Sequence, residues 1–221
     1  MRAIKFLFKF IIYFILITVA WVGLYAIVPP PMTATMIMDE NSITKDWTSF
    51  SDISPNMVRA VIAAEDGKFC SHDGFDTEAI QKAIARNAQG GRIRGGSTIS
   101  QQVAKNAFLW QGGGFFRKGL EAYFTFLIET IWSKQRIMEV YLNIAETGIG
   151  TYGVQAGAQR YFNKDAKDLT GIEAARIAAA LPLPKKRAVN GASGFTRRYG
   201  NTIAARINVV RNEKLDSCIY K

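Results

Sequence analysis

Two glutamates in this chain lie beside residues that suit acid–base chemistry on an anionic substrate. The first, Glu65, precedes Asp66 at the end of an apolar helical stretch that leads into a glycine-containing loop. A carboxyl group at such an edge is partly desolvated, which raises its pKa and suits it to act as a general base. The alternative is that both acids only solvate a helix end. His72, further along the loop, fits a structural hydrogen-bonding role.

The second glutamate follows two cations. The run Arg117-Lys118-Gly-Leu-Glu121 places Glu121 on the same helical face as Arg117 and Lys118. Two cations on one face can hold phosphate oxygens while the glutamate is positioned against a leaving group. The simpler alternative is a local salt bridge.

A polar stretch between the two glutamates, residues 95–106, could bind the same substrate. It opens with Gly95-Gly96, where the backbone can bend and approach a ligand closely. Hydroxyl, amide and ammonium groups then recur at helical spacing, from Ser97 or Thr98 through Gln101 or Gln102 to Lys105. Together with a helix N-terminus capped by Ser97 or Thr98, they suit an oxygen-rich or anionic ligand. An ordinary capped surface helix is the alternative.

The composition limits the class of protein. The chain has 221 residues, is 48% hydrophobic and carries a formal charge of +10. It is too apolar for a disordered chain, and its charge suits nucleic acid, acidic lipid or a phosphorylated substrate without choosing among them. The one histidine excludes a multi-histidine metal site and argues against a Ser-His-Asp triad. Cys70 and Cys218 could form a disulfide or remain two free buried thiols.

An apolar segment near the N-terminus predicts a membrane anchor. Residues 10–28 contain no charge and would form a helix about 28 Å long, close to the thickness of a bilayer core. Arg2, Lys5 and Lys9 precede it, which favours a cytoplasmic N-terminus. A cleaved signal peptide is the alternative, but the apolar run is long and no small-x-small cleavage site follows. We therefore predict a cytoplasmic segment at 1–9, a transmembrane helix at 10–28, a tether at 29–51 and one domain at 52–221.

Hydrophobic periodicity and capping residues predict that this domain is mainly α-helical. The expected helices begin at Ser54-Pro55, at Asp76 (through Ala88, closed by Gly90 and Gly91), at Ser97, at Phe116, at Ser133, at Gly153, at the capping box 170–173 and at Phe195.

Two further surfaces could face a membrane. Residues 107–116 place three glycines among aromatic side chains, which indicates either packed core or an exposed loop that dips into lipid. The basic C-terminal third, including Lys185, Lys186, Arg187, Arg197 and Arg198, could face anionic headgroups. A solvated basic face accounts for it equally well.

Taken in order, the stretches 65–74, 95–106 and 117–121 resemble the peptidoglycan glycosyltransferases of family 51, and 134–143 and 150–153 agree with them. The resemblance implies a lysozyme-like, mainly α-helical fold with a larger lobe and a smaller membrane-facing lobe. It implies that a glycan strand on undecaprenyl pyrophosphate is transferred to the sugar 4-hydroxyl of lipid II, forming a β-1,4 bond with inversion. Glu65 then matches the general base, and Glu121 the glutamate that assists the leaving pyrophosphate. The matching substrate-binding positions are Ser97, Thr98, Gln102, Lys105, Asn106, Arg117, Lys118, Glu139, Tyr141 and Asn143.

The same resemblance implies the partners and the location. Expected partners are lipid II, the lipid-linked glycan strand, membrane lipids and other cell wall synthesis and division proteins, with no nucleic acid. Mg²⁺ or Mn²⁺ is a candidate bridge between phosphate and carboxylate, no metal ligand is firmly assigned, and no organic cofactor is expected. The expected location is the bacterial inner membrane, with the catalytic domain in the periplasm. Moenomycin, a phosphoglycolipid mimic of the donor, should bind the cleft.

Two rival functions remain open from the sequence. A hydrolase or lytic transglycosylase on the same kind of fold would also use one catalytic glutamate. The cations at Lys105, Arg117 and Lys118 argue against it, because a neutral glycan needs no phosphate site. A non-enzymatic basic membrane module would explain the charge and the anchor, but not the two glutamates beside a glycine turn and a cation pair.

Overall fold

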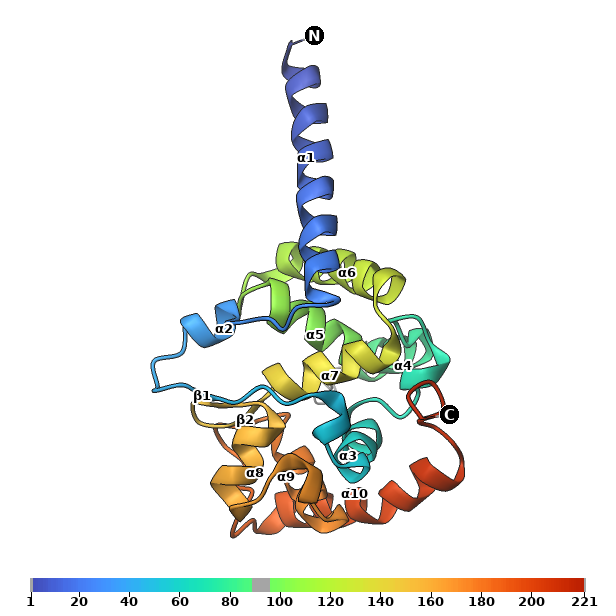
Figure 1. Ribbon diagram of the computed structural model, residues 1–221. Coiled ribbons are helices and arrows are strands. Elements are labelled where there is room, and N and C mark those ends of the chain that lie inside the picture. The colour runs from blue at the N-terminus through green and yellow to red at the C-terminus, as the bar shows by residue number, and fades with distance from the viewer. Residues whose placement is uncertain (1, 89–95, 221) are drawn as a thin grey trace.

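The computed structural model describes residues 2–88 and 96–220, and it is predominantly helical, as the sequence predicts (Figure 1). Its α-helices are α1 (Arg2–Tyr25), α2 (Ala34–Ile37), α3 (Pro55–Glu65), α4 (Thr77–Ala88), α5 (Ile99–Phe108), α6 (Gly114–Ile131), α7 (Lys134–Ile144), α8 (Val154–Phe162), α9 (Gly171–Ala180) and α10 (Gly194–Asn212). Short 3₁₀ turns are η1 (Phe50–Asp52), η2 (Phe69–Ser71) and η3 (Ala166–Asp168). The predicted helix end at Gly90 and Gly91 and the bend at Gly95 lie outside the described residues.

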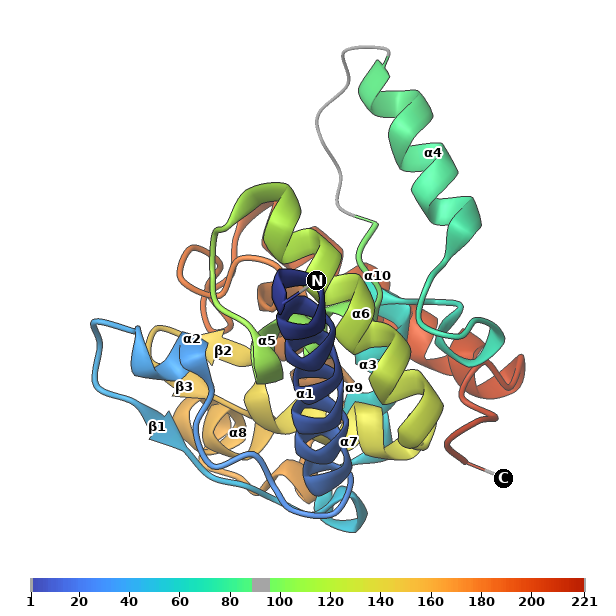
Figure 2. The same ribbon diagram turned by 90° about the horizontal axis from the view of Figure 1, so that it is seen from above.

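The helices of the folded body form two groups. Helix α5 packs against α6 and α7 close to the end of α1, whereas α3, α9 and α10 pack against one another at the opposite end (Figure 1). Helix α4 projects from the side of the body (Figure 2). Two helical groups agree with the expected two lobes, while the likeness to lysozyme stays a prediction.

Helix α1 is long and apolar enough to span a membrane and is mostly exposed. Its C-terminal part is docked on the body: the Thr18 and Tyr123 hydroxyls lie 2.7 Å apart, and the Trp132 indole donates to the Val22 carbonyl at 2.9 Å. Arg136 of α7 donates to the carbonyl of Tyr25 at 2.9 Å. The C-terminal part of α1 therefore continues into the packed core of the α5–α7 group.

The prediction of a tether at 29–51 needs correction, because this segment is folded against the domain. It contains α2 and β1 (Thr44–Lys45), and β1 pairs in parallel with β3 (Thr151–Tyr152), which pairs antiparallel with β2 (Glu146–Gly148). The Asn143 side chain also bonds the amide and the carbonyl of Thr48 at 2.8 and 2.9 Å. All these partners are about a hundred residues away in sequence, so no local pattern shows them.

Capping residues mark the helix starts as predicted. Ser54, Thr98, Ser133 and Thr170 each accept a backbone N–H of the following turn, and Thr98 and Thr170 form complete capping boxes. Helix α6 begins at Gly114, two residues before the expected start.

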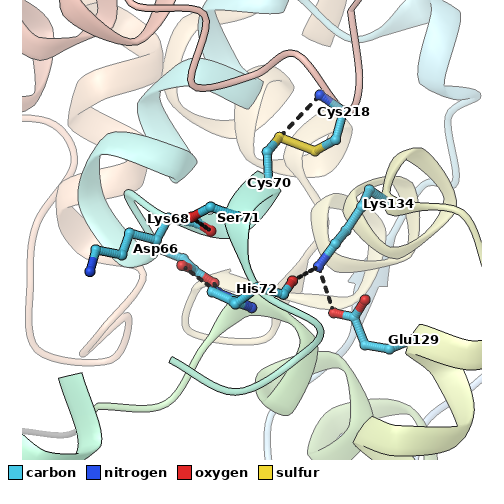
Figure 3. The surroundings of a disulfide bond; sticks show 8 residues. All are labelled: Asp66, Lys68, Cys70, Ser71, His72, Glu129, Lys134 and Cys218. Carbon is cyan, nitrogen blue, oxygen red and sulfur yellow. Dashed lines mark hydrogen bonds and ion pairs between the residues drawn. A yellow bond between two sulfur atoms is a disulfide. The ribbon is translucent and has the colours of Figure 1, made fainter. Parts of the chain in front are cut away.

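Cys70 and Cys218 form a disulfide, which decides between the two alternatives left open by the sequence (Figure 3). The bond joins η2, in the loop that follows Glu65, to the C-terminal segment. The Arg59–Asp216 ion pair, at 2.7 Å, holds the same segment against α3. The disulfide and the ion pair thus hold the C-terminal segment beside the loop that follows Glu65.

Removing this disulfide should destabilise the fold. The bond closes a loop with a sequence separation of 148 residues, so its loss raises the entropy of the unfolded chain. We expect the double variant Cys70→Ser/Cys218→Ser to lower the free energy of unfolding by about 2–5 kcal/mol, measured by denaturant unfolding. The wild type measured with reductant should have the same free energy of unfolding as the double variant. Equal stabilities with and without the bond would contradict this account.

Candidate active site

The carboxylate of Glu65 has one oxygen held by a hydrogen bond and one that no described residue bonds. Gln102 of α5 donates its side-chain N–H to Glu65 Oε2 at 2.8 Å. The other oxygen, Oε1, is buried and no described residue donates a hydrogen bond to it. Burial raises the pKa of Glu65, opposed by the Gln102 hydrogen bond and by the charges of Arg187 and Lys105. Because Glu65 and Gln102 come from different helical groups, the Glu65 carboxylate lies between these groups.

Asp66, the residue after Glu65, holds the start of α5 and the ring of His72 in place. Its buried carboxylate accepts the backbone N–H of Ile99, the first residue of α5, at 3.1 Å. His72 Nε2 lies 3.0 Å from the same carboxylate (Figure 3). On the other side of the ring, His72 Nδ1 accepts the N–H of Gly74. Nδ1 is therefore the unprotonated nitrogen in the neutral ring, and Nε2 donates to Asp66. This is the structural role predicted for His72, and it ties the end of α3 to the start of α5.

The second glutamate is held by two cations, as predicted. Arg117 Nη1 lies 2.6 Å from Glu121 Oε2, and Lys118 forms an ion pair with Oε1. Glu121 is only 2% exposed, and Lys118 also donates to the Ser97 hydroxyl at 3.4 Å. Burial lowers the pKa of Lys105, and the charges of Arg117 and Lys118 lower it further while Glu121 opposes them. Three cations and one carboxylate thus share a small region.

Two hollows open beside these groups. Glu65, Ser97 and Thr98 line one of about 180 Å³, and Gln102, Lys105 and Asn106 line another of about 190 Å³. The Glu65–Gln102 hydrogen bond connects the two linings. A larger cavity of about 460 Å³ lies between α9 and α10 and is lined by none of the predicted site residues. The chemical groups, and not the cavity size, mark the site.

Comparison with known proteins identifies the family of this chain. The transglycosylase family model matches residues 32–211, which includes both glutamates and all the motif residues. The chain belongs to this family. It is 49% identical to the biosynthetic peptidoglycan transglycosylase of Caulobacter vibrioides (89% of this chain, 87% of the relative) and 49% identical to that of Pseudomonas aeruginosa (81% and 82%). The Salmonella enteritidis protein of the same name is 52% identical over 80% of this chain and 77% of its own. The chain is a peptidoglycan glycosyltransferase.

Some predicted substrate-binding residues of this transglycosylase are engaged within the fold. Thr98 is buried and donates its hydroxyl to the Gly74 carbonyl at 2.7 Å. Glu139 accepts the N–H of Phe50 at 3.0 Å. The buried Asn143 side chain accepts the N–H of Thr48, two residues before Phe50. Neither Glu139 nor Asn143 lines a described hollow. Their observed contacts support the walls of the site, and a direct substrate contact stays a prediction.

Unlike Glu139 and Asn143, Tyr141 lines one of the two hollows. It is 1% exposed but lines the hollow that contains Gln102 and Lys105. Burial raises the pKa of its hydroxyl well above the usual value, and the nearby charges of Glu65 and Asp66 add to this. The Tyr141 hydroxyl therefore stays neutral near Glu65.

No local sequence pattern indicates that α10 and the segment before it contribute to this transglycosylase site. The Tyr199 hydroxyl donates to the carbonyl of Ala64, the residue before Glu65, at 2.7 Å. Arg187 donates to the Ala179 carbonyl at 2.8 Å and lies over the Tyr199 ring. The sequence alone groups Arg187 with cations that could face lipid, whereas the structure places it against Tyr199. Since α10 lies at the end of the body opposite to α1, a solvated face is the better account of Arg197 and Arg198 (Figure 1).

The aromatic segment divides between core and surface. Phe108 and Leu109 are buried, whereas Phe115 is 98% and Phe116 is 73% exposed. The two exposed rings begin α6, the helix that packs against α1 (Figure 1). Both sequence interpretations are thus partly right, and contact of Phe115 and Phe116 with lipid stays a prediction.

Proposed function

We propose that this glycosyltransferase polymerises lipid II into β-1,4 glycan strands and releases undecaprenyl pyrophosphate. The buried Oε1 of Glu65, which no described residue engages, carries the proposal. Glu65 takes the proton of the acceptor 4-hydroxyl while that oxygen forms a bond to the anomeric carbon of the donor. The bond from this carbon to the pyrophosphate oxygen breaks on the opposite face, so the configuration inverts. Such a displacement needs a base and no enzyme nucleophile.

Lys105, Arg117 and Lys118, here called the cation cluster, receive the leaving group in this reaction. A pyrophosphate that departs gains negative charge, and preorganised cations stabilise that charge in a site shielded from water. Arg117 and Lys118 are held in place by Glu121, and Lys105 lies within electrostatic reach of all three. Lys118 also bonds Ser97, which connects the cluster to the start of α5.

The described residues do not fit a resident divalent metal. Both oxygens of Glu121 are already paired with cations, and the described part of the chain contains no group of three or more acidic, histidine or cysteine side chains that could hold an ion. We infer that Mg²⁺ or Mn²⁺, where present, arrives on the substrate phosphates. No step of the proposed reaction depends on it.

We also propose that the chain crosses the bacterial inner membrane once, with its catalytic domain in the periplasm. Arg2, Lys5 and Lys9 precede the apolar part of α1, and such cations favour the cytoplasmic side. The C-terminal end of α1 is docked on the α5–α7 group, so the site stays near the membrane surface from which a lipid-linked substrate comes.

Polymerisation of purified lipid II in detergent tests this function. The proposal predicts long strands with a lipid pyrophosphate product. If the protein makes no strands and shortens preformed ones, it acts as a lytic enzyme and the proposal is wrong. If it does neither and only binds anionic vesicles, the non-enzymatic interpretation replaces it.

A phosphoglycolipid inhibitor should bind through the cation cluster. Moenomycin carries a phosphate in place of the donor pyrophosphate, so losing Arg117 and Lys118 removes its charge-assisted hydrogen bonds. We expect Arg117→Ala/Lys118→Ala to weaken moenomycin binding by about 100-fold, measured by calorimetry in detergent. The double variant Arg197→Ala/Arg198→Ala on α10 is the matched control for lost charge. Unchanged affinity in the first variant would place the phosphate site elsewhere.

A further inference from the structure

A hollow of about 460 Å³ lies between α9 and α10, at the end of the body opposite to α1 (Figure 1). We call it the α9–α10 hollow. It shares no lining residue with the two hollows of the candidate active site. Because the candidate membrane span is at the other end of the molecule, a ligand reaches this hollow from the solvent and not from the lipid.

Two arginines make this hollow positive. Arg176 comes from α9 and Arg197 from α10, so the packing of the two helices brings them to one place. Both are exposed to solvent, and within the described part of the chain neither side chain has an acidic or hydrogen-bonding partner. Arg59, Arg117 and Arg136, in contrast, are each paired with an acid. None of the described residues that line the hollow is acidic, so its charge favours an anion.

The first turn of α10 adds to this positive potential. Ala192 and Thr196, which line the hollow, lie on either side of Ser193 in the sequence, and Ser193 directly precedes α10. The Ser193 side chain makes no capping bond to the helix, and the first turn contains no acidic residue. The positive end of this 19-residue helix is therefore uncompensated. An anion in the hollow would meet the two arginines and the helix N-terminus together.

The walls of the hollow are apolar and built from small residues. Ala179 and Ala204 line it from the two helices, and Val189, which is only 2% exposed, lines it from the segment between them. At Gly200 an added Cβ would lie 3.7 Å from the Ala179 Cβ, so the two helices are close there. Guanidinium groups bind carboxylates and phosphates alike, but methyl groups fill such walls best. The ligand that fits is a peptide carboxylate carried beside small apolar side chains.

The family of the chain supplies such a ligand. The product of a peptidoglycan glycosyltransferase carries short peptides that contain alanine methyl groups and free carboxylates. In a membrane-anchored enzyme, finished strands lie beyond the end of the body that is farthest from α1, where this hollow is (Figure 1). We propose that Arg176 and Arg197 bind the peptide carboxylates of finished peptidoglycan in the α9–α10 hollow and so hold the enzyme against the wall. The inference rests on the family of the chain and not on the proposed reaction.

Sedimentation with purified sacculi, which are intact peptidoglycan, tests this binding. The full-length protein in detergent and low salt is mixed with sacculi, and the sedimented fraction gives an apparent Kd. We expect Arg176→Ala/Arg197→Ala to weaken binding by about tenfold, because the charge-assisted hydrogen bonds are lost. Ala204→Leu, which fills part of the hollow and keeps the charge, should also weaken it. Thermal unfolding of each variant shows that it is folded.

Arg198→Ala/Arg206→Ala is the matched control. Both residues are exposed arginines of α10, lie outside the hollow and have no described side-chain partner, so their loss changes the net charge equally. Sacculi whose peptides have been removed by an amidase should bind the wild type less tightly than intact sacculi.

Three results would overturn the inference. The wild type does not sediment with sacculi, it binds the peptide-free glycan as tightly as the intact wall, or the hollow variants sediment like the matched control. Sedimentation requires no catalysis, so each of these results leaves the polymerase function to be decided by the lipid II assay.

Discussion

Replacing Glu65 with glutamine should lower the rate of glycan polymerisation by about 10²–10⁴-fold, the range expected for loss of a general base. Glutamine has nearly the same shape and can still accept the hydrogen bond from Gln102, but it cannot take the acceptor proton. The measurement is the initial rate of lipid II polymerisation in detergent, with thermal unfolding to show that the variant is folded.

The pH dependence of the wild type provides a second measurement of the same residue. The base must be deprotonated, and burial raises the pKa of Glu65. Activity should therefore fall as the pH drops through this raised pKa, at a higher pH than for an ordinary glutamate. The residual activity of Glu65→Gln should lack this decline. Glu213→Gln, at an exposed position, should keep the wild-type rate and profile. A Glu65→Gln variant with near wild-type activity would remove Glu65 from the role of base.

Replacing Glu121 with glutamine should have the next largest effect, a loss of about 10²–10³-fold in turnover. The carboxylate is buried between Arg117 and Lys118, and no amide can pair with both cations through charge. Without it the two like charges repel, and neither is held where the pyrophosphate departs. Measured lipid II turnover should fall more than the affinity for substrate, because the stabilised charge develops during the reaction.

Near wild-type turnover by Glu121→Gln would contradict this prediction. If Glu121→Gln turns over within a factor of about three of the wild type, the ion pairs with Arg117 and Lys118 are the local salt bridge of the simpler interpretation. The cations could then still bind phosphate, and the weakened moenomycin binding of Arg117→Ala/Lys118→Ala would show it. The two experiments thus separate the role of the carboxylate from the role of the cations.

Features that depend on neighbours along the chain could be predicted from the amino-acid order. Capping at Ser54, Thr98 and Thr170 follows from side chains three residues or fewer from the amides that they bond. The pairing of Arg117 and Lys118 with Glu121 follows from the helical repeat, which places such residues on one face. The apolar length of α1 and the order of the motifs could likewise be recognised in the sequence. The order of the motifs indicated the family.

How the helices and loops come together is visible only in the folded molecule. Gln102 reaches Glu65 across 37 residues, and Asp66 holds the start of α5 across 33. The Cys70–Cys218 bond and the folding of residues 29–51 onto the domain depend on partners farther away still. Such contacts arise when helices pack, and packing depends on the shape of the whole core, which no local pattern encodes. The groove lined by Asp39, Glu146 and Lys185 is built from separate segments of the chain, so it became visible for the same reason.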